Sequence, residues 1–424
     1  MTKASRRKVI ISGMLGNGLE WYDYALYGQM VAVFAQLFFS FGPGTSPASS
    51  LIMTYLTFAA GFVARPVGAV LFGRIGDKYG RKKALTASMI LMAIPTGAIG
   101  LLPTYAQIGM AAPILLLCIR ILQGLSLGGA FSGSMSYVVE HSDPHCRARS
   151  GSATMISLVV GFLIGSLVST VVASSMSHES FISWGWRLPF FVGVLIGLVG
   201  FWIRNHGEES PAYAEAKESG NLSQSPVKEA FLKQPKKMLQ GFCFYLFVTI
   251  PFYTLAIYMI SYSKVHLGLT QEQALQANSI GMLAMLLPIW PAAQLADHFG
   301  RRNVMMAVIV LMALLLYPAF TVMQSGVYLN IVVANAAMSF LLGAYIAPIP
   351  ALLVELFPTR IRYTGMSLAY NFCAIIGGLT PAFAEKLIGV TGSNTSLMYP
   401  LFFASAASFL ALLSYKDVYR EKLA

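Results

Sequence analysis

Charged residues are scarce in this chain, and their scarcity argues against a soluble protein. Asp, Glu, Lys and Arg make up 11% of the 424 residues, whereas soluble domains carry about 25%. Hydrophobic residues reach 56%, and a soluble fold of this composition could not cover its surface with polar groups. The composition therefore predicts an all-α polytopic membrane protein, with the lipid bilayer as its surroundings.

Cysteine is also rare. The chain has four cysteines, Cys118, Cys146, Cys243 and Cys373. They are far apart and form no CxxC pair, which argues against a disulfide framework or a zinc site. One short segment looks capable of binding a metal, with His141, Asp143, His145 and Cys146. Because no second cluster accompanies it, we predict no metal and no organic cofactor.

Acidic residues are fewer than basic ones, 17 against 29, so the net charge is +12. A basic chain can indicate a nucleic-acid partner, but here the basic residues gather in alternate loops between apolar runs. Positively charged loops stay on the cytoplasmic side of a membrane. We therefore expect no nucleic-acid partner, and a multi-pass protein of the cell (inner) membrane with both termini cytoplasmic.

Long apolar runs are what the chain has in abundance. Each is long enough to cross about 30 Å of bilayer. The runs lie near residues 10–36, 50–73, 84–102, 112–140, 149–174, 187–204, 238–262, 274–297, 303–323, 328–354, 361–386 and 397–415. They predict twelve spans: an N-terminal six-helix bundle over 1–204, a cytoplasmic linker over 205–237 and a C-terminal bundle over 238–424.

A short charged loop occurs twice. Asp77, Gly80 and Arg81 correspond to Asp297, Gly300 and Arg301 with a constant offset of 220 residues. An internal repeat in an apolar chain is typical of transporters built from two similar halves. Each aspartate can lie against a helix N-terminus, and each arginine can reach a glutamate. The candidate gating residues are Asp77, Arg81, Glu140, Asp297, Arg301, Glu355 and Arg362; the plainer alternative is that these loops only mark topology.

Two acids lie well inside the first span. Glu20 and Asp23 are three residues apart, so they share one helix face. Arg120 in the fourth span lies at a similar depth, about 20 Å from the inner surface at 1.5 Å per residue. A carboxylate that pairs with an arginine in one state and loses it in another can take up a proton. Asp23, with Glu20 second, is our candidate for proton coupling, and a static ion pair is the alternative.

Aromatic and polar residues of other spans are candidates for binding a substrate. Prolines interrupt the seventh and tenth spans, as at substrate-facing helices of transporters, and aromatic faces suit an ammonium group. The candidates are Tyr27, Arg65, Arg120, Gln123, Tyr253, Tyr345, Tyr370 and Asn371. The nucleophile-elbow pattern of Gly124–Gly128 falls inside an apolar helix, so we interpret it as coincidence and predict no enzyme.

Several motifs resemble those of the major facilitator superfamily, and in particular its metabolite:proton symporter branch. They are Gly16-Asn-Gly-Leu-Glu20-Trp21-Tyr22-Asp23, Arg65-Pro66-Val-Gly68, Arg120-xx-Gln123-Gly124, Trp186-Arg187-Leu-Pro189-Phe190 and Glu355-Leu-Phe-Pro358-Thr359-xx-Arg362. The run from Arg362 to Asn371 is most similar to the proline/betaine members. This resemblance implies proton-coupled uptake of a small metabolite.

Two departures stand beside the resemblance. Ala130 replaces a glutamate common in relatives, and the chain ends about ten residues after its last span, which argues against osmosensing through a coiled-coil tail. We expect a monomeric proton symporter of a zwitterion such as proline, betaine or another amino acid. The alternatives are symport of a di- or tricarboxylate such as citrate, 2-oxoglutarate or shikimate, a proton-coupled exporter, and a membrane sensor that transports nothing.

Overall fold

The computed structural model describes residues 14, 17, 18 and 20–421, except 43, 45, 80, 129, 141, 206–231, 233 and 420. In these residues all regular structure is helical. Eight helical segments have the length and hydropathy to cross a membrane, and three shorter helices are also apolar. Together with the first apolar segment, residues 20–38, they account for the twelve predicted spans.

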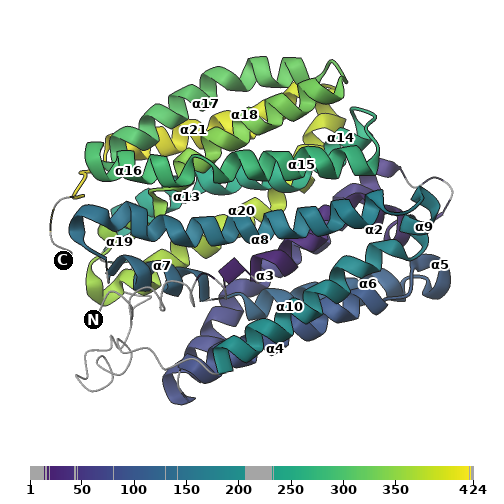
Figure 1. Ribbon diagram of the computed structural model, residues 1–424, viewed down its shortest axis with the longest axis horizontal. Helices are drawn as coiled ribbons and strands as arrows, with labels where there is room; N and C mark the ends of the chain where they lie inside the picture. The colour runs from purple at the N-terminus through teal and green to yellow at the C-terminus, as the bar shows by residue number, and fades with distance from the viewer. Residues whose placement is uncertain are drawn as a thin grey trace.

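The first half of the chain forms one bundle (Figure 1). Residues 20–38, which end in α2 (Val31–Phe38), come first. The other spans are α3 (Pro47–Tyr79), α4 (Arg81–Leu101), α6 (Ala111–Ser126) with α7 (Ala130–Glu140), α8 (Arg147–Ser174) and α10 (Leu188–Asn205). Short helices connect them: α5 (Tyr105–Ile108), η1 (Pro144–Cys146), α9 (His178–Ser183) and η2 (Gly185–Arg187).

The second half forms a similar bundle. Its first span is α13 (Pro235–Tyr253), the π-helix η3 (Thr254–Tyr258) and α14 (Met259–Val265). The others are α15 (Gln271–Leu286) with α16 (Ile289–Phe299), α17 (Arg301–Met323), α18 (Tyr328–Ile346) with α19 (Ile349–Leu356), α20 (Thr359–Thr391) and, after η4 (Asn394–Leu397), α21 (Met398–Leu413). The two bundles meet along two seams, α3 against α20 and α8 against α15.

The fourth and tenth spans are interrupted at equivalent places. The fourth breaks after Leu127, between α6 and α7, and the tenth breaks at Pro348, which precedes α19. Proline lacks the N–H that would continue the helix ladder, and glycine at 128 weakens it. Each broken span then has a glutamate in its last turn, Glu140 or Glu355, so the repeat seen in the loops extends to the spans.

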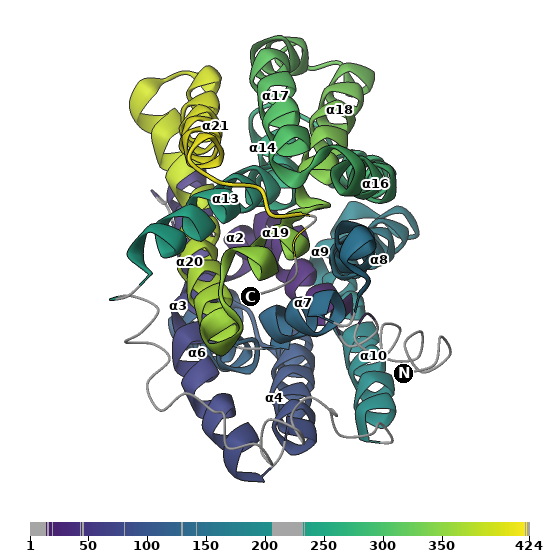
Figure 2. The same ribbon diagram turned by 90° about the vertical axis from the view of Figure 1, so that its left-hand side faces the viewer.

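Charged residues define one end of the molecule. We call this end, where Glu140, Arg147, Asp297, Glu355 and Arg362 lie, the ion-pair face, and the other end, where α2 and α14 end, the opposite face. Figure 2 looks onto the ion-pair face, with α7, α8, α16, α19 and α20 grouped around its centre.

Candidate functional site

Glycines bring α3 and α6 into backbone contact in the first bundle. A Cβ added at Gly124 would overlap the carbonyl group of Gly61, and one added at Gly68 would overlap that of Leu125. Only glycine allows helices to approach this closely. The crossing fixes two arginines, because Arg65 follows Gly61 by one turn and Arg120 precedes Gly124 by one turn.

Both arginines are buried among aromatic rings, with exposed fractions of 1% for Arg65 and 0% for Arg120. The Tyr24 ring lies near both, with its centroid 4.7 Å from the Arg65 Cζ atom and 4.8 Å from that of Arg120. Phe62 lies 4.3 Å from Arg65, and Tyr27 lies 4.4 Å from Arg120. Such rings attract a guanidinium through their electron-rich faces but supply no negative charge.

Each guanidinium group keeps unused donors. Arg65 donates from Nη1 to the Tyr370 hydroxyl at 2.8 Å, and Arg120 donates from Nη1 to the Gln123 side-chain oxygen. Among the described residues, the Nε and Nη2 atoms of both arginines have no hydrogen-bond partner, and neither arginine forms an ion pair with a carboxylate. Two buried cations that no described carboxylate contacts directly form a site that suits an anionic group.

Asp23 is connected to Arg120 indirectly. Gln123 accepts from Arg120 and donates to the Thr96 hydroxyl at 2.8 Å. The Thr96 hydroxyl itself donates to the Met92 carbonyl oxygen at 2.9 Å, and the Thr96 side chain lies beside the Asp23 carboxyl group. The expected direct ion pair of Asp23 with Arg120 is absent from the described residues. Arg120 donates to Gln123 instead, and the rings of Tyr24 and Tyr27 lie against its guanidinium group.

The Asp23 carboxyl group is buried. Its exposed fraction is 4%, and Oδ1 has no hydrogen-bond partner in the described part of the chain. A Cβ added at Gly193 of α10 would lie 2.7 Å from this oxygen, so glycine makes room for the acid. Glu20 is also buried and close enough to Asp23 to interact through its charge. The two acids and the two arginines therefore belong to one buried polar group of the first bundle.

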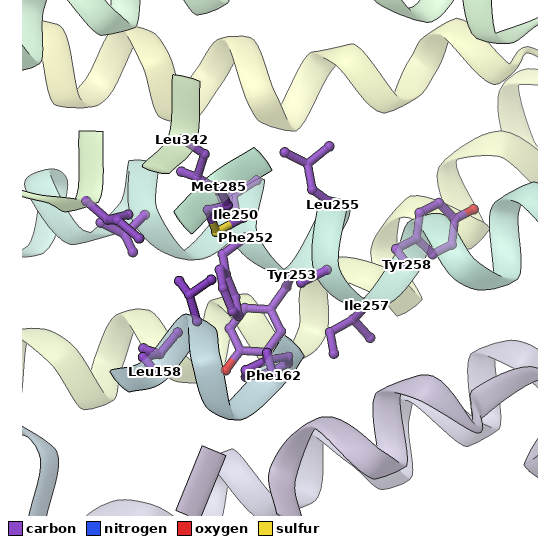
Figure 3. Close-up of a cluster of buried hydrophobic side chains, with 14 of the residues drawn as sticks. Leu158, Phe162, Ile250, Phe252, Tyr253, Leu255, Ile257, Tyr258, Met285 and Leu342 are labelled. Carbon is purple, nitrogen blue, oxygen red and sulfur yellow. The ribbon is translucent and has the colours of Figure 1, made fainter. Parts of the chain in front are cut away.

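Other predicted residues reach this group from the second bundle. Tyr370 contacts Phe131 at 5.2 Å between ring centroids, and Tyr253 contacts Phe62 at 5.2 Å. Figure 3 shows Tyr253 and Phe252 beside Phe162. The Asn371 side-chain nitrogen donates to the Gly128 carbonyl oxygen at 3.3 Å, across the seam. These side chains form one aromatic boundary between the bundles.

Two predicted substrate-binding residues have their hydroxyl groups occupied. Tyr27 donates to the Thr54 carbonyl oxygen at 3.0 Å while its ring faces Arg120. Tyr345 lies apart from the arginines, inside the second bundle. Its hydroxyl is 3.0 Å from the Phe244 carbonyl oxygen and 2.6 Å from the Ser408 hydroxyl. Tyr345 is thus held by packing between α13, α18 and α21.

Three carboxylates join the bundles at the ion-pair face. Asp297 accepts from the backbone N–H groups of Ala148, at 2.9 Å, and Arg149, at 3.1 Å, at the N-terminus of α8. A carboxylate there also interacts favourably with the helix dipole. Arg301 lies 3.2 Å from Asp297. The side chains of Asp77 and Arg81, the repeat partners, lie outside the described residues.

The two glutamates hold the same face from symmetry-related positions. Glu355 lies between Arg147, at 3.3 Å, and Arg301, at 3.1 Å. Glu140 pairs with Arg362 at 2.9 Å. Each glutamate therefore pairs with an arginine of the other bundle, which ties the two halves together on this side.

Sequence reasoning missed several of these residues. Arg147 follows Glu140 by the spacing at which Arg362 follows Glu355, an offset of 215 residues between the halves; a second search for repeats would have found it. Thr96, Tyr24, Phe58 and Phe62 carry no such signal, because single aromatic or hydroxyl residues are common in apolar helices.

Comparison with known proteins agrees with the fold. The family model "Sugar (and other) transporter" matches residues 9–229, and the model "Major Facilitator Superfamily" matches residues 242–423. Among solved structures, a D-xylose-proton symporter has a TM-score of 0.74 at 18% identity, covering 96% of both chains. A proton:xylose symporter bound to 6-bromo-6-deoxy-D-glucose has a TM-score of 0.77 at 17% identity, covering 100% of this chain and 98% of that one.

Curated relatives are more similar in sequence. The proline/betaine transporter of Salmonella typhimurium is 34% identical over 96% of this chain and 82% of its own length. A glycine betaine/proline/ectoine/pipecolic acid transporter of Dickeya dadantii is 33% identical over the same shares, and the proline/betaine transporter of Escherichia coli K12 is 32% identical over the same shares. The chain is therefore a multi-pass membrane transporter of the major facilitator superfamily, in the family that contains the proline/betaine transporters.

Proposed function

We propose that this protein is a proton-coupled symporter that imports a small zwitterion, of the proline or betaine class, by alternating access. The observation that carries the proposal is the pair of buried arginines without a carboxylate partner in the described residues. A substrate carboxylate would use their free donors. The names of the curated relatives support the substrate class.

The substrate's cationic group would lie against the aromatic boundary between the bundles. Trp21, Phe131 and Tyr370 pack against one another there, and a quaternary ammonium binds well to such ring faces. Tyr253 and Asn371 extend the same boundary from the second bundle. In this arrangement the first bundle binds the carboxylate of the substrate, and side chains of both bundles bind its cationic group.

Proton coupling is proposed for Asp23, with Glu20 second. Asp23 is buried with one unpartnered oxygen, and Thr96 and Gln123 connect it to Arg120. A substrate that draws the Arg120 side chain towards itself would alter the contacts from Arg120 through Gln123 and Thr96 to Asp23. It would thereby change the free energy of protonating Asp23. Binding of substrate and proton would then favour each other.

The remaining proposals concern organisation. The ion-pair face would lie in the cytoplasm with both termini and the linker 205–237, and the opposite face would lie outside. The bundles 1–204 and 238–424 would rock against each other around the arginines, in a monomer.

The test is uptake into proteoliposomes with an imposed pH gradient, using proline, glycine betaine, citrate and 2-oxoglutarate. The proposal predicts gradient-driven accumulation of proline or glycine betaine. Arg65→Lys and Arg120→Lys should each lower uptake at least about tenfold, because lysine keeps the charge but loses the planar set of donors. Tyr345→Phe, a buried tyrosine away from the arginines, is the matched control and should retain uptake.

Asp23→Asn separates coupling from binding. This variant should lose accumulation in response to the gradient while counterflow exchange without a gradient continues. Accumulation by Asp23→Asn at the parent's level would refute its role and direct attention to Glu20.

One observation favours a second substrate class. Two arginines, rather than one, have free donors, and a dicarboxylate could bind both. Accumulation of citrate or 2-oxoglutarate, with no accumulation of proline or glycine betaine, would establish this alternative.

A further inference from the structure

Another buried carboxylate lies in the second bundle. Glu385 is 23 residues after Arg362 along α20, which places it about 35 Å from the ion-pair face at 1.5 Å per residue. Its side chain is 2% exposed. The Tyr258 hydroxyl donates to Oε2 at 2.6 Å, and the His266 Nε2 atom lies 3.1 Å from each carboxylate oxygen.

His266 connects this carboxylate to the outside of the molecule. Its side chain is 20% exposed, whereas that of Glu385 is 2% exposed. An imidazole can exchange protons with water near neutral pH and pass one to a hydrogen-bonded carboxylate. Among the described residues, this is the one contact between an acidic and a basic side chain away from the ion-pair face. A buried acid in a membrane-spanning helix is costly and is usually retained for function.

The carboxylate also holds the segment that closes the opposite face. Tyr258 is the last residue of the π-helix η3, a type of helix that is frequent at functional sites. Its ring lies 5.9 Å from that of Tyr55 on α3, in the first bundle, and the Tyr55 hydroxyl is 2.6 Å from the Ser261 hydroxyl. Ile257, beside Tyr258 in Figure 3, packs on Gly28 of the first bundle. Contacts between the bundles thus depend on where η3 is held.

Other titratable groups lie on the elements that carry or adjoin the pair. They are Tyr55 on α3, Tyr245 and Tyr253 on α13, Tyr262 and Lys264 on α14, Glu272 on α15, and Lys386 on α20. Tyr262 packs on the His266 ring at 5.3 Å, and Glu272 accepts from Gln276. In the described structure only Tyr258 and His266 bond to the Glu385 carboxylate. The proposal therefore concerns the Glu385 carboxylate and the imidazole that bonds to it.

We propose that Glu385 and His266 form a second proton-binding site, loaded from the opposite face, that controls the opening of this face through Tyr258 and η3. A proton from water binds the imidazole, and the Nε2 proton moves to the Glu385 carboxylate. The products are a neutral imidazole and a neutral carboxylic acid, with one proton gained overall. Tyr258 then loses a charge-assisted hydrogen bond, which is about twice as strong as a neutral one. Its hold on η3 weakens, and the contact of Tyr55 with Ser261 can separate.

The inference rests on the proposed function only in that the opening of the opposite face would serve transport. Proton binding and opening can be measured without transport, so the test uses purified protein without substrate or gradient. Ser169 of α8 is fully buried, has no hydrogen-bond partner, and follows the seam residue Ser166 by three positions. A Ser169→Cys reporter is labelled with a maleimide between pH 8 and pH 5.5. The labelling rate is divided by that of Ser46→Cys, an exposed site, to correct for thiol ionisation.

The corrected rate should rise about tenfold as the pH falls. With Glu385→Gln it should be high at every pH, because the acid stays neutral. With His266→Gln the pH dependence should flatten. Glu272→Gln, the matched control on α15, should behave like the parent. If Glu385→Gln does not fold, Tyr258→Phe provides the test. It should raise the corrected labelling rate at pH 8 and reduce the increase of this rate between pH 8 and pH 5.5.

A parent rate that does not change with pH, or an unchanged response in the folded variants, would overturn the inference. Asp23→Asn should show the same pH dependence of labelling as the parent while it loses gradient-driven uptake. This combination separates the Glu385–His266 site from the coupling site. If the parent shows no gradient-driven uptake but its Ser169→Cys labelling still depends on pH, the proposed function is refuted and this inference stands.

Discussion

The two faces of the molecule are closed by different chemistry. At the ion-pair face, Glu355 alone lies between two arginines, and Asp297 accepts from the start of α8. At the opposite face, the contacts between bundles are neutral, as in the Ser166–Ser279 hydroxyl pair at 2.8 Å and the Gln29–Asn278 amide pair at 3.3 Å. Buried charge pairs are far more costly to break than neutral hydrogen bonds. The ion-pair face should therefore need the larger perturbation to open.

The largest effect is expected from Glu355→Gln. The substitution leaves Arg147 and Arg301 without a full negative charge between them, and breaking a buried pair costs about 3–5 kcal/mol. The ion-pair face should open, and transport should fall at least about thirtyfold. The measurement is uptake together with labelling of an Ala351→Cys reporter, a fully buried position on α19. The control is Glu179→Gln on α9, and an unlabelled reporter in Glu355→Gln would contradict the comparison.

Glu140→Gln tests the symmetry-related pair and should have a smaller effect. The Glu140 side chain is 32% exposed and pairs with Arg362 alone, and partly exposed ion pairs contribute about 1 kcal/mol or less. We expect uptake to fall about fivefold, with the Ala351→Cys reporter labelled more slowly than in Glu355→Gln. Equal effects of Glu140→Gln and Glu355→Gln would mean that burial does not decide how much each ion pair contributes to closing the face.

Ser166→Ala probes the opposite face. Loss of one neutral hydrogen bond costs about 1 kcal/mol, which should raise labelling of Ser169→Cys about two- to threefold and change uptake by no more than that. Ser174→Ala on the exposed end of α8 is the control, because its hydroxyl bonds only within its own helix. A loss of uptake as large as that of Glu355→Gln would reverse the ranking of the faces.

A change of ionic strength should have the smallest effect on labelling. It distinguishes the two faces without any substitution beyond the cysteine reporters. Raising salt from about 0.05 to about 1 M shortens the screening length from about 14 Å to about 3 Å. Labelling of Ala351→Cys should rise less than about twofold, since most charges there are buried, and labelling of Ser169→Cys should not change. A salt response confined to Ser169→Cys would contradict the assignment of charge to the ion-pair face.

The sequence was sufficient for the fold because the bilayer leaves few choices. Twelve apolar runs can only be spanning helices, and the repeat of Asp77 in Asp297 places them in two halves. The break before α19 was expected from Pro348. The π-helix η3 was not expected in this form: Pro251, three residues before it, predicts an interruption of the seventh span but not the type of helix that follows.

The candidate site was predicted only in part. Arg65, Arg120 and Asp23 attract notice because charge is costly at membrane depth. Their partners could not be read from the chain, since the order Arg120, Gln123, Thr96, Asp23 depends on how α4, α6 and the first span cross. Glu385 lies at the end of the predicted span 361–386, where an acid gives no signal of a site. Its partner His266 lies 119 residues away, a separation with no periodic signal.

The glycine crossing of α3 and α6 has a consequence for selectivity. Because Gly61, Gly68 and Gly124 leave no room between the two backbones, the helices cannot slide or separate as the bundles rock. Arg65 and Arg120 therefore keep the same spacing whether the protein is open to one side of the membrane or to the other. The substrate carboxylate therefore meets these two arginines at the same backbone spacing at entry and at release, so the protein should discriminate among substrates equally well in both directions.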